Sequence, residues 1–168
     1  MLKQTRKSDR GFTLIELAIV LVIVGIFAAI SAPNLLGLLN RYRLNQATDT
    51  LVGAIKEAQI QAIRQGKLCR IIINSNNTLT GDPPGCLLSS RSIRGNIKIR
   101  NNIPGAISNI SFSYKGNTTK AGTIVLSSQG TNSQKCFVIS LGTGIARTGI
   151  YTGEKTGSIL GKKCKKKS

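Results

Sequence analysis

The pattern of hydrophobic and polar positions sets residues 12–32 apart from the rest of the chain. Leu17–Ile30 is a run of 14 residues without a polar side chain. The wider segment from Phe12 to Ala32 covers 21 residues, and only Thr13, Glu16 and Ser31 interrupt it. As an α-helix this segment would rise roughly 31 Å, close to the hydrocarbon thickness of a bilayer. The pattern therefore predicts a helix that spans a membrane.

A helical period continues beyond this segment. Pro33 predicts a kink, because proline removes a backbone donor and crowds the preceding turn. Apolar residues then recur at spacings of three and four, which predicts an amphipathic helix: Leu44, Ala47, Leu51, Ala54, Ile55, Ala58 and Ala62. Gly66 is the expected C-cap.

After Gly66 the apolar residues come in short runs between turn clusters, a pattern typical of strands. The expected strands are Cys69–Ile73, Ile97–Arg100, Ile110–Tyr114, Thr123–Leu126, Cys136–Leu141 and Ile145–Tyr151, with turns at "NSNN" 74–77, "GDPPG" 81–85, "NNIPG" 101–105, "KGN" 115–117 and "TNSQK" 131–135. The predicted fold class is α+β. A long N-terminal helix, transmembrane in its first half and amphipathic in its second, packs on a mostly antiparallel C-terminal β domain.

The start of the apolar segment carries an ionisable residue, Glu16. A carboxylate in hydrocarbon costs about 2.5–3.5 kcal/mol by the lower estimates, so an interaction must offset this cost. The surrounding residues, "RGFTLIEL" at 10–17, resemble the N-terminal signature of type IV pilins and of the pseudopilins of type II secretion. The resemblance implies that a prepilin peptidase cuts between Gly11 and Phe12 and that Phe12 is then N-methylated.

The same resemblance implies a role for Glu16 in assembly. In this class the helices stack into a filament core, and Glu16 matches the carboxylate that meets the N-terminal amine of a neighbouring subunit, here on Phe12. Two opposite charges cost far less together than alone in apolar surroundings. The alternative is that Glu16, four residues into the apolar segment, reaches the lipid headgroups.

The second half of the chain is similar to the FimT/GspH-type minor pilins. The similar segments are "IKEAQIQAIRQGK" at 55–67 and "GTGIARTG" at 142–149. In that group a two-sheet β domain sits on the helix, and some members with basic C-termini are linked to DNA uptake. Arg147 matches the Gly-Arg-rich segment of the group, whereas Ile145 stands where another Arg is expected.

Charge is the second strong feature of the sequence. Lys and Arg total 24 against six acids, for a net charge of +18, which favours a polyanionic partner or surface. The candidate DNA contacts are Arg147, Lys162, Lys163, Lys165, Lys166 and Lys167. Aromatic residues are sparse, which argues against a base-stacking platform. The alternative is a solvated basic surface matched to acidic partner subunits.

The even number of cysteines fits two disulfides in a domain outside the cytoplasm. Four cysteines allow three pairings. We favour Cys69–Cys86 and Cys136–Cys164, because each closes a local loop and the second would fix the tail. The chain has no C-x-x-C spacing, which argues against a zinc site. It also has no His to activate a nucleophile. We therefore expect no catalytic residue, metal or cofactor, and a membrane-anchored periplasmic enzyme has little support.

The resemblance and the pattern together predict the following organisation: a basic leader at 1–11, a transmembrane and filament-core helix at 12–33, an amphipathic continuation at 34–66, a periplasmic β domain at 67–161 and a basic tail at 162–168. Basic residues of the leader would keep the N-terminus in the cytoplasm. The interpretation is a minor pilin or pseudopilin of a type IV pilus or a type II secretion pseudopilus. It would be held in the bacterial inner membrane by a single pass, processed by prepilin peptidase and assembled with other pilin or pseudopilin subunits. The alternative is a minor pilin that binds DNA during uptake.

Overall fold

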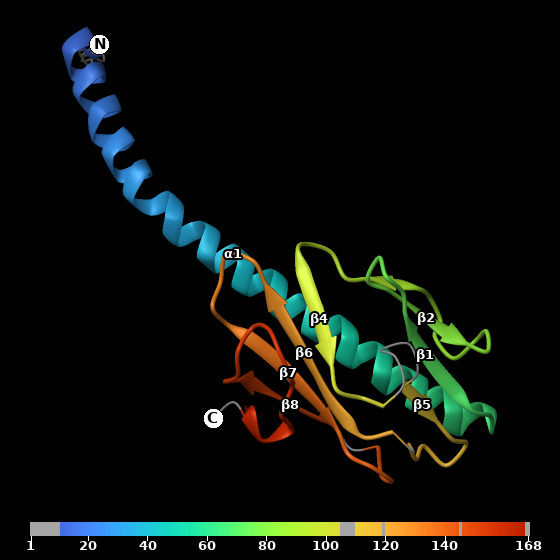
Figure 1. Cartoon of the computed structure of the whole chain (residues 1–168). Coiled ribbons are helices and arrows are strands. Elements are labelled where there is room, and N and C mark those ends of the chain that lie inside the picture. The colour runs from blue at the N-terminus through green and yellow to red at the C-terminus, as the bar shows by residue number, and fades with distance from the viewer. Residues whose placement is uncertain (1–10, 105–109, 119, 145, 167–168) are drawn as a thin grey trace, which may run out of the picture. The chain divides into compact units, whose positions relative to one another are not determined.

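The computed structural model describes residues 11–104, 110–118, 120–144 and 146–166 (Figure 1). Most of the predicted leader, residues 1–10, and the candidate DNA contact Lys167 lie outside the described residues. The chain divides into two units, residues 1–36 and 37–168, each described by itself below.

Helix α1 (Leu14–Gln65) ends where the sequence places its C-cap. Gly66 has a φ of +63°, the left-handed conformation that glycine adopts without steric cost. Its N–H donates to the carbonyl of Ile63 at 3.3 Å, and the N–H of Lys67 donates to the carbonyl of Ala62 at 3.2 Å. These two bonds form a Schellman motif, which satisfies carbonyls that the helix end would otherwise leave unpaired.

By length and composition, no single helix among the described residues is long and apolar enough to cross a membrane. The segments Leu14–Ile30 and Leu35–Gln65 meet those criteria only when taken together as a bent pair. The membrane span and the kink at Pro33 therefore stay predictions.

The described strands form two antiparallel sheets in the second unit (Figure 1). The first sheet has the order β3-β2-β1-β5, from β1 (Cys69–Ile73), β2 (Thr78–Asp82), β3 (Arg91–Ser92) and β5 (Ile110–Phe112). The second has the order β4-β6-β7-β8-β9, from β4 (Ile97–Asn101), β6 (Gly122–Ser128), β7 (Gln134–Ile139), β8 (Ala146–Tyr151) and β9 (Cys164–Lys166), with a short 3₁₀ helix η1 (Gly161–Lys163) before β9. The predicted α+β class is confirmed.

Three of these strands, β2, β3 and β9, were not predicted. The turn expected at 81–85 is wrong for Gly81 and Asp82, which extend β2. Asp82 lies opposite Arg70 of β1, and the two side chains form an ion pair at 3.2 Å. The turn expected at 131–135 is similarly wrong for Gln134 and Lys135, which begin β7 and pair with β6. Cross-strand pairing thus outweighs the turn preference of these residues.

The amphipathic stripe of α1 lies in the core of the second unit. All seven of its predicted apolar residues are at most 4% exposed. They pack against apolar side chains of both sheets, including Ile71 and Leu79 from the first and Ile124 and Phe137 from the second. Four of the seven are alanines, which let both sheets approach the helix closely. A smaller cluster lies on the other face of the second sheet and contains Val125, Cys136, Tyr151, Ile159 and Cys164.

Candidate functional site

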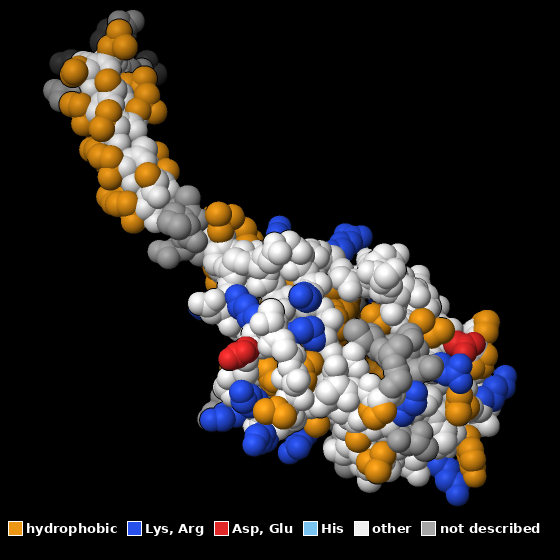
Figure 2. Space-filling model, viewed as in Figure 1, with side chains coloured by type: hydrophobic (Ala, Val, Ile, Leu, Met, Phe, Trp, Pro, Cys, Tyr) orange, Lys and Arg blue, Asp and Glu red, His pale blue; other side chains and the backbone are white. Residues whose placement is uncertain are grey.

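The first turns of α1 expose apolar side chains all round. Every large apolar side chain described from Phe12 to Ile30 is at least 47% exposed, and hydrophobic atoms cover this part of the helix in Figure 2. Fully burying such a side chain is worth about 1.5–3 kcal/mol. A helix exposed in this way therefore requires lipid or other helices around it.

Thr13 caps the start of this helix. Its hydroxyl oxygen accepts the N–H of Glu16 at 3.3 Å, and its carbonyl accepts the N–H of Leu17 at 3.1 Å. Glu16 lies in the first turn, where a negative charge interacts favourably with the helix dipole. Sequence reasoning missed the role of Thr13, although the Thr-x-x-Glu spacing of a capping box was there to indicate it. Gly11 and Phe12, the predicted cleavage pair, lie just before the helix.

Two disulfides are present, in the pairing favoured from the sequence. Cys69 of β1 is joined to Cys86 in the loop between β2 and β3, with Cα atoms 5.4 Å apart. Cys136 of β7 and Cys164 of β9 are joined with Cα atoms 5.8 Å apart. The second bond fixes the described part of the basic tail, up to Lys166, to the second sheet. With both bonds formed, none of the four cysteines is free.

The structure brings the described candidate DNA contacts to one edge of the second sheet. Arg147 lies in β8, Lys162 and Lys163 lie in η1, and Lys165 and Lys166 lie in β9 at the sheet edge. Figure 2 shows Lys and Arg side chains gathered at the lower left, beside the C-terminal end marked in Figure 1. We call these five residues the edge strip.

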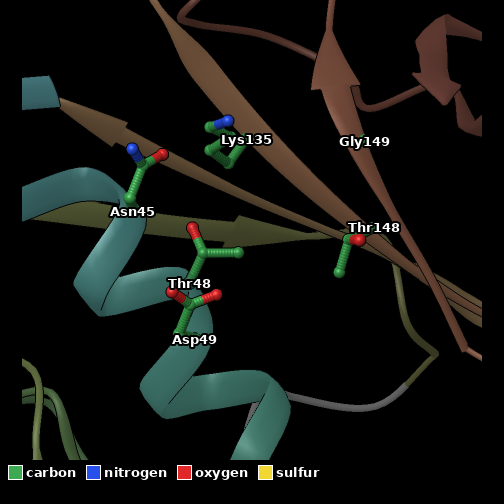
Figure 3. Close-up of a pocket in the computed structure, with 6 residues that line it drawn as sticks. All are labelled: Asn45, Thr48, Asp49, Lys135, Thr148 and Gly149. Atoms are coloured by element: carbon green, nitrogen blue, oxygen red, sulfur yellow. The ribbon is translucent and has the colours of Figure 1, made fainter. Parts of the chain in front are cut away.

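A groove of about 290 Å³ separates α1 from β7 and β8 next to this strip (Figure 3). Asn45, Thr48 and Asp49 line it from the helix, and Lys135 and Thr148 line it from the strands. Among the described residues neither Asp49 nor Lys135 forms an ion pair. The sequence offered no signal for this arrangement, because its residues lie far apart along the chain.

The described part of the chain holds no cluster of three or more Cys, Asp or Glu side chains placed to bind a metal ion. The distinctive features of the described residues are an exposed apolar helix surface, a cluster of positive charges and a carboxylate at the start of the helix.

Comparison with known proteins identifies the N-terminal segment. Residues 6–32 match the family model described as the prokaryotic N-terminal methylation motif. A fimbrial protein of Pseudomonas aeruginosa is 44% identical over 61 residues, which cover 36% of this chain and 39% of that protein. The type II secretion system core protein G of Klebsiella michiganensis is 56% identical over 32 residues, or 19% of this chain and 22% of that protein. The N-terminal segment of this chain is therefore similar to that of type IV pilins and pseudopilins.

A further relative supports the same class. The type IV narrow pilus major component PilA5 of Thermus thermophilus is 46% identical over 59 residues, which cover 34% of this chain and 49% of that protein. The chain thus spans less than half the length of each of these pilin-class relatives. No solved structure gives a significant match. The resemblance that the sequence indicated at 10–17 is confirmed at the level of the class.

Proposed function

We propose that this chain is a minor pilin or pseudopilin subunit of a type IV pilus or a type II secretion pseudopilus. It is made with a leader, cut by prepilin peptidase between Gly11 and Phe12, methylated at Phe12 and assembled through its N-terminal helix. The methylation motif and the pilin relatives support this proposal.

The observation that carries the proposal is the exposed apolar helix that begins at Leu14, after its cap Thr13, and bears Glu16. Before assembly, the inner membrane would cover this surface in a single pass, with the second unit in the periplasm. After assembly, helices of other subunits would cover it. Either surrounding is apolar, so the Glu16 carboxylate needs a partner there. The partner proposed is the N-terminal ammonium of Phe12 on a neighbouring subunit.

The test replaces Glu16 by Gln, which keeps the shape of the side chain and removes its charge. Cells that make this variant, or the control Asp49→Asn, are separated into membranes and sheared filaments. Glu16→Gln should insert and mature normally, because a desolvation cost has been removed, yet it should be depleted from filaments. Asp49→Asn should enter filaments at the native level.

Two results would count against the pairing. Glu16→Gln in filaments at the native level would show that the carboxylate lies at the headgroups without an assembly role. Failure of Glu16→Gln to insert would contradict the energetic argument, because the neutral chain should enter hydrocarbon more easily.

A second candidate function, DNA binding during uptake, is favoured by the edge strip. None of its five cations forms an ion pair among the described residues, so their charge is available to phosphates. Fluorescence anisotropy of labelled DNA with the full chain in a nonionic detergent tests this candidate. Binding should weaken steeply as salt rises, because each phosphate contact releases counterions.

A further inference from the structure

The basic tail is held in place by more than its disulfide. β9 pairs with β8 through Lys166 opposite Gly149, Lys165 opposite Ile150 and Cys164 opposite Tyr151. The N–H and the hydroxyl of Thr152 both donate to the carbonyl of Lys163, at 3.0 and 3.1 Å. The described lysines of the tail, which lie between Lys162 and Lys166, therefore have fixed backbone positions.

Gly149 makes this pairing sterically possible. A Cβ built on Gly149 would overlap the carbonyl oxygen of Lys165 and would lie 3.3 Å from the sulfur of Cys164. Any larger residue at position 149 would push β9 away from β8. The close approach of the two strands thus depends on a glycine inside β8.

The register places cations on both faces of the sheet edge. Lys166 lies opposite Gly149, so it shares a face with Arg147, two residues earlier in β8, at the diagonal distance at which long side chains meet. Lys165 lies on the other face, in one cross-strand row with Ile150 and with Lys135 of β7. The edge therefore carries positive charge on each side of the sheet.

Protection of a sheet edge explains only part of this pattern. Lysines on an edge strand discourage pairing with other chains, which would account for Lys165 and Lys166. Protection of the edge does not account for Arg147 in β8 or for Lys135 in β7, because both strands are paired on both sides. Side chains of like charge held together without ion pairs repel one another, which favours an anionic ligand as their function.

We propose that the β8–β9 edge inserts along a groove of double-stranded nucleic acid, where its two faces contact the phosphates of the two strands, and that the Cys136–Cys164 disulfide builds this edge. The proposal rests on the second candidate function above. A flat anionic membrane would meet only one face of the edge. Stacking on single-stranded bases would need exposed aromatic rings, whereas Tyr151 of β8 is buried.

The proposed contacts are to phosphates, which carry no sequence information, so binding would follow backbone charge and groove shape. Asp49 faces Lys135 across the groove of Figure 3 and would repel phosphates on that side. Asp49→Asn should therefore raise the affinity for the duplex, whereas removal of lysines from the edge should lower it.

The experiment measures anisotropy of a labelled 24-base-pair duplex, and of a single strand of the same length, with the full chain in nonionic detergent over a range of salt concentrations. K165Q/K166Q removes two positive charges from the edge. The control is K56Q/K67Q, which also removes two exposed positive charges, one from α1 and one from the residue after Gly66. K165Q/K166Q should lower duplex affinity on the order of tenfold or more at low salt and reduce the salt slope by about 2. The control should change neither by a comparable amount.

Two further variants keep every cation and test the construction of the edge. C136A/C164A removes the disulfide, and Gly149→Ala displaces β9 with the disulfide intact. Both should weaken duplex binding severalfold, while C69A/C86A, in the first sheet, should bind as the native chain does. Circular dichroism confirms that each variant is folded, and Gly149→Ala tests the edge even if loss of the disulfide unfolds the chain.

The outcomes separate this inference from the function on which it rests. If the native chain does not bind DNA, the second candidate function fails. If it binds but K165Q/K166Q behaves as the control does, or if Gly149→Ala and C136A/C164A bind normally, the proposed edge is wrong. Equal affinity for the single strand would overturn the groove geometry. Displacement of duplex by micelles containing phosphatidylglycerol, lost in K165Q/K166Q, would assign the edge to an anionic lipid surface.

Discussion

Glu57 of α1 and Arg91 of β3 form an ion pair that joins the helix to the edge of the first sheet. The other carboxylate oxygen of Glu57 accepts the N–H of Leu88 at 2.7 Å. The Glu57 side chain is only 14% exposed. Gly53, one turn earlier on α1, leaves room for the guanidinium, since a Cβ there would lie 2.9 Å from an Arg91 nitrogen. One carboxylate therefore fixes both the loop and the short strand that follows it.

Replacing Glu57 by Ala should lower the free energy of unfolding by about 2 kcal/mol, because a half-buried guanidinium and a backbone N–H lose their acceptor. Asp82→Ala is the matched control. It breaks the more exposed pair with Arg70, with side chains 40% and 48% exposed, and should cost at most about 1 kcal/mol. Urea unfolding in nonionic detergent, followed by tyrosine fluorescence, measures both. Equal losses would show that the Glu57 contacts are not important for stability.

The apolar stripe of α1 gives a second stability prediction. Leu51→Ala should destabilise the second unit by about 2–5 kcal/mol, because it leaves a cavity in a fully buried position. Ile60→Ala, on a side chain that is 54% exposed, should cost less than about 1 kcal/mol. The same unfolding measurement compares them. A larger effect at Ile60 would contradict the assignment of the buried face.

Loss of the first disulfide should also destabilise the fold. C69A/C86A removes a bond between residues 17 apart in sequence. It should lower the free energy of unfolding by about 2–4 kcal/mol, chiefly because the unfolded chain gains conformational entropy. The midpoint of urea unfolding should fall in the absence of reductant. Addition of reductant should then lower the stability of the native chain further than that of C69A/C86A, which retains only Cys136–Cys164. A native chain indifferent to reductant would contradict the prediction.

Processing of the N-terminus gives a fourth prediction. Gly11→Val should leave the precursor uncut in cells that make prepilin peptidase, because a branched side chain would stand at the proposed cleavage position. Ser8→Ala, inside the leader, should be cut and methylated normally. Intact-mass analysis distinguishes the precursor from a mature chain that begins at methylated Phe12. Normal maturation of Gly11→Val would place the cut elsewhere.

Patterns that are local in sequence predicted most of the helix. The three-to-four spacing from Leu44 to Ala62 indicated the buried face, and Gly66 indicated the end, because both depend on neighbouring residues of one helix. The apolar runs after Gly66 indicated six strands, with ends that differ from the observed ones by at most two residues. The short strands β2, β3 and β9 escaped, because polar and basic residues favour them only once a partner strand supplies backbone hydrogen bonds.

The sequence by itself determined an apolar N-terminal helix with Glu16 near its start, its amphipathic continuation and a chain of strands with enough cysteines for two disulfides. Each follows from residue type and spacing over a few turns. Only the tertiary structure decided that Lys165 and Lys166 lie on opposite faces of one sheet edge and that Arg147 shares a face with Lys166 at a diagonal position. That arrangement depends on the register between β8 and β9, which the Cys136–Cys164 bond and the missing side chain of Gly149 set together. Register is a relation between distant segments, and a shift of one residue would exchange the faces.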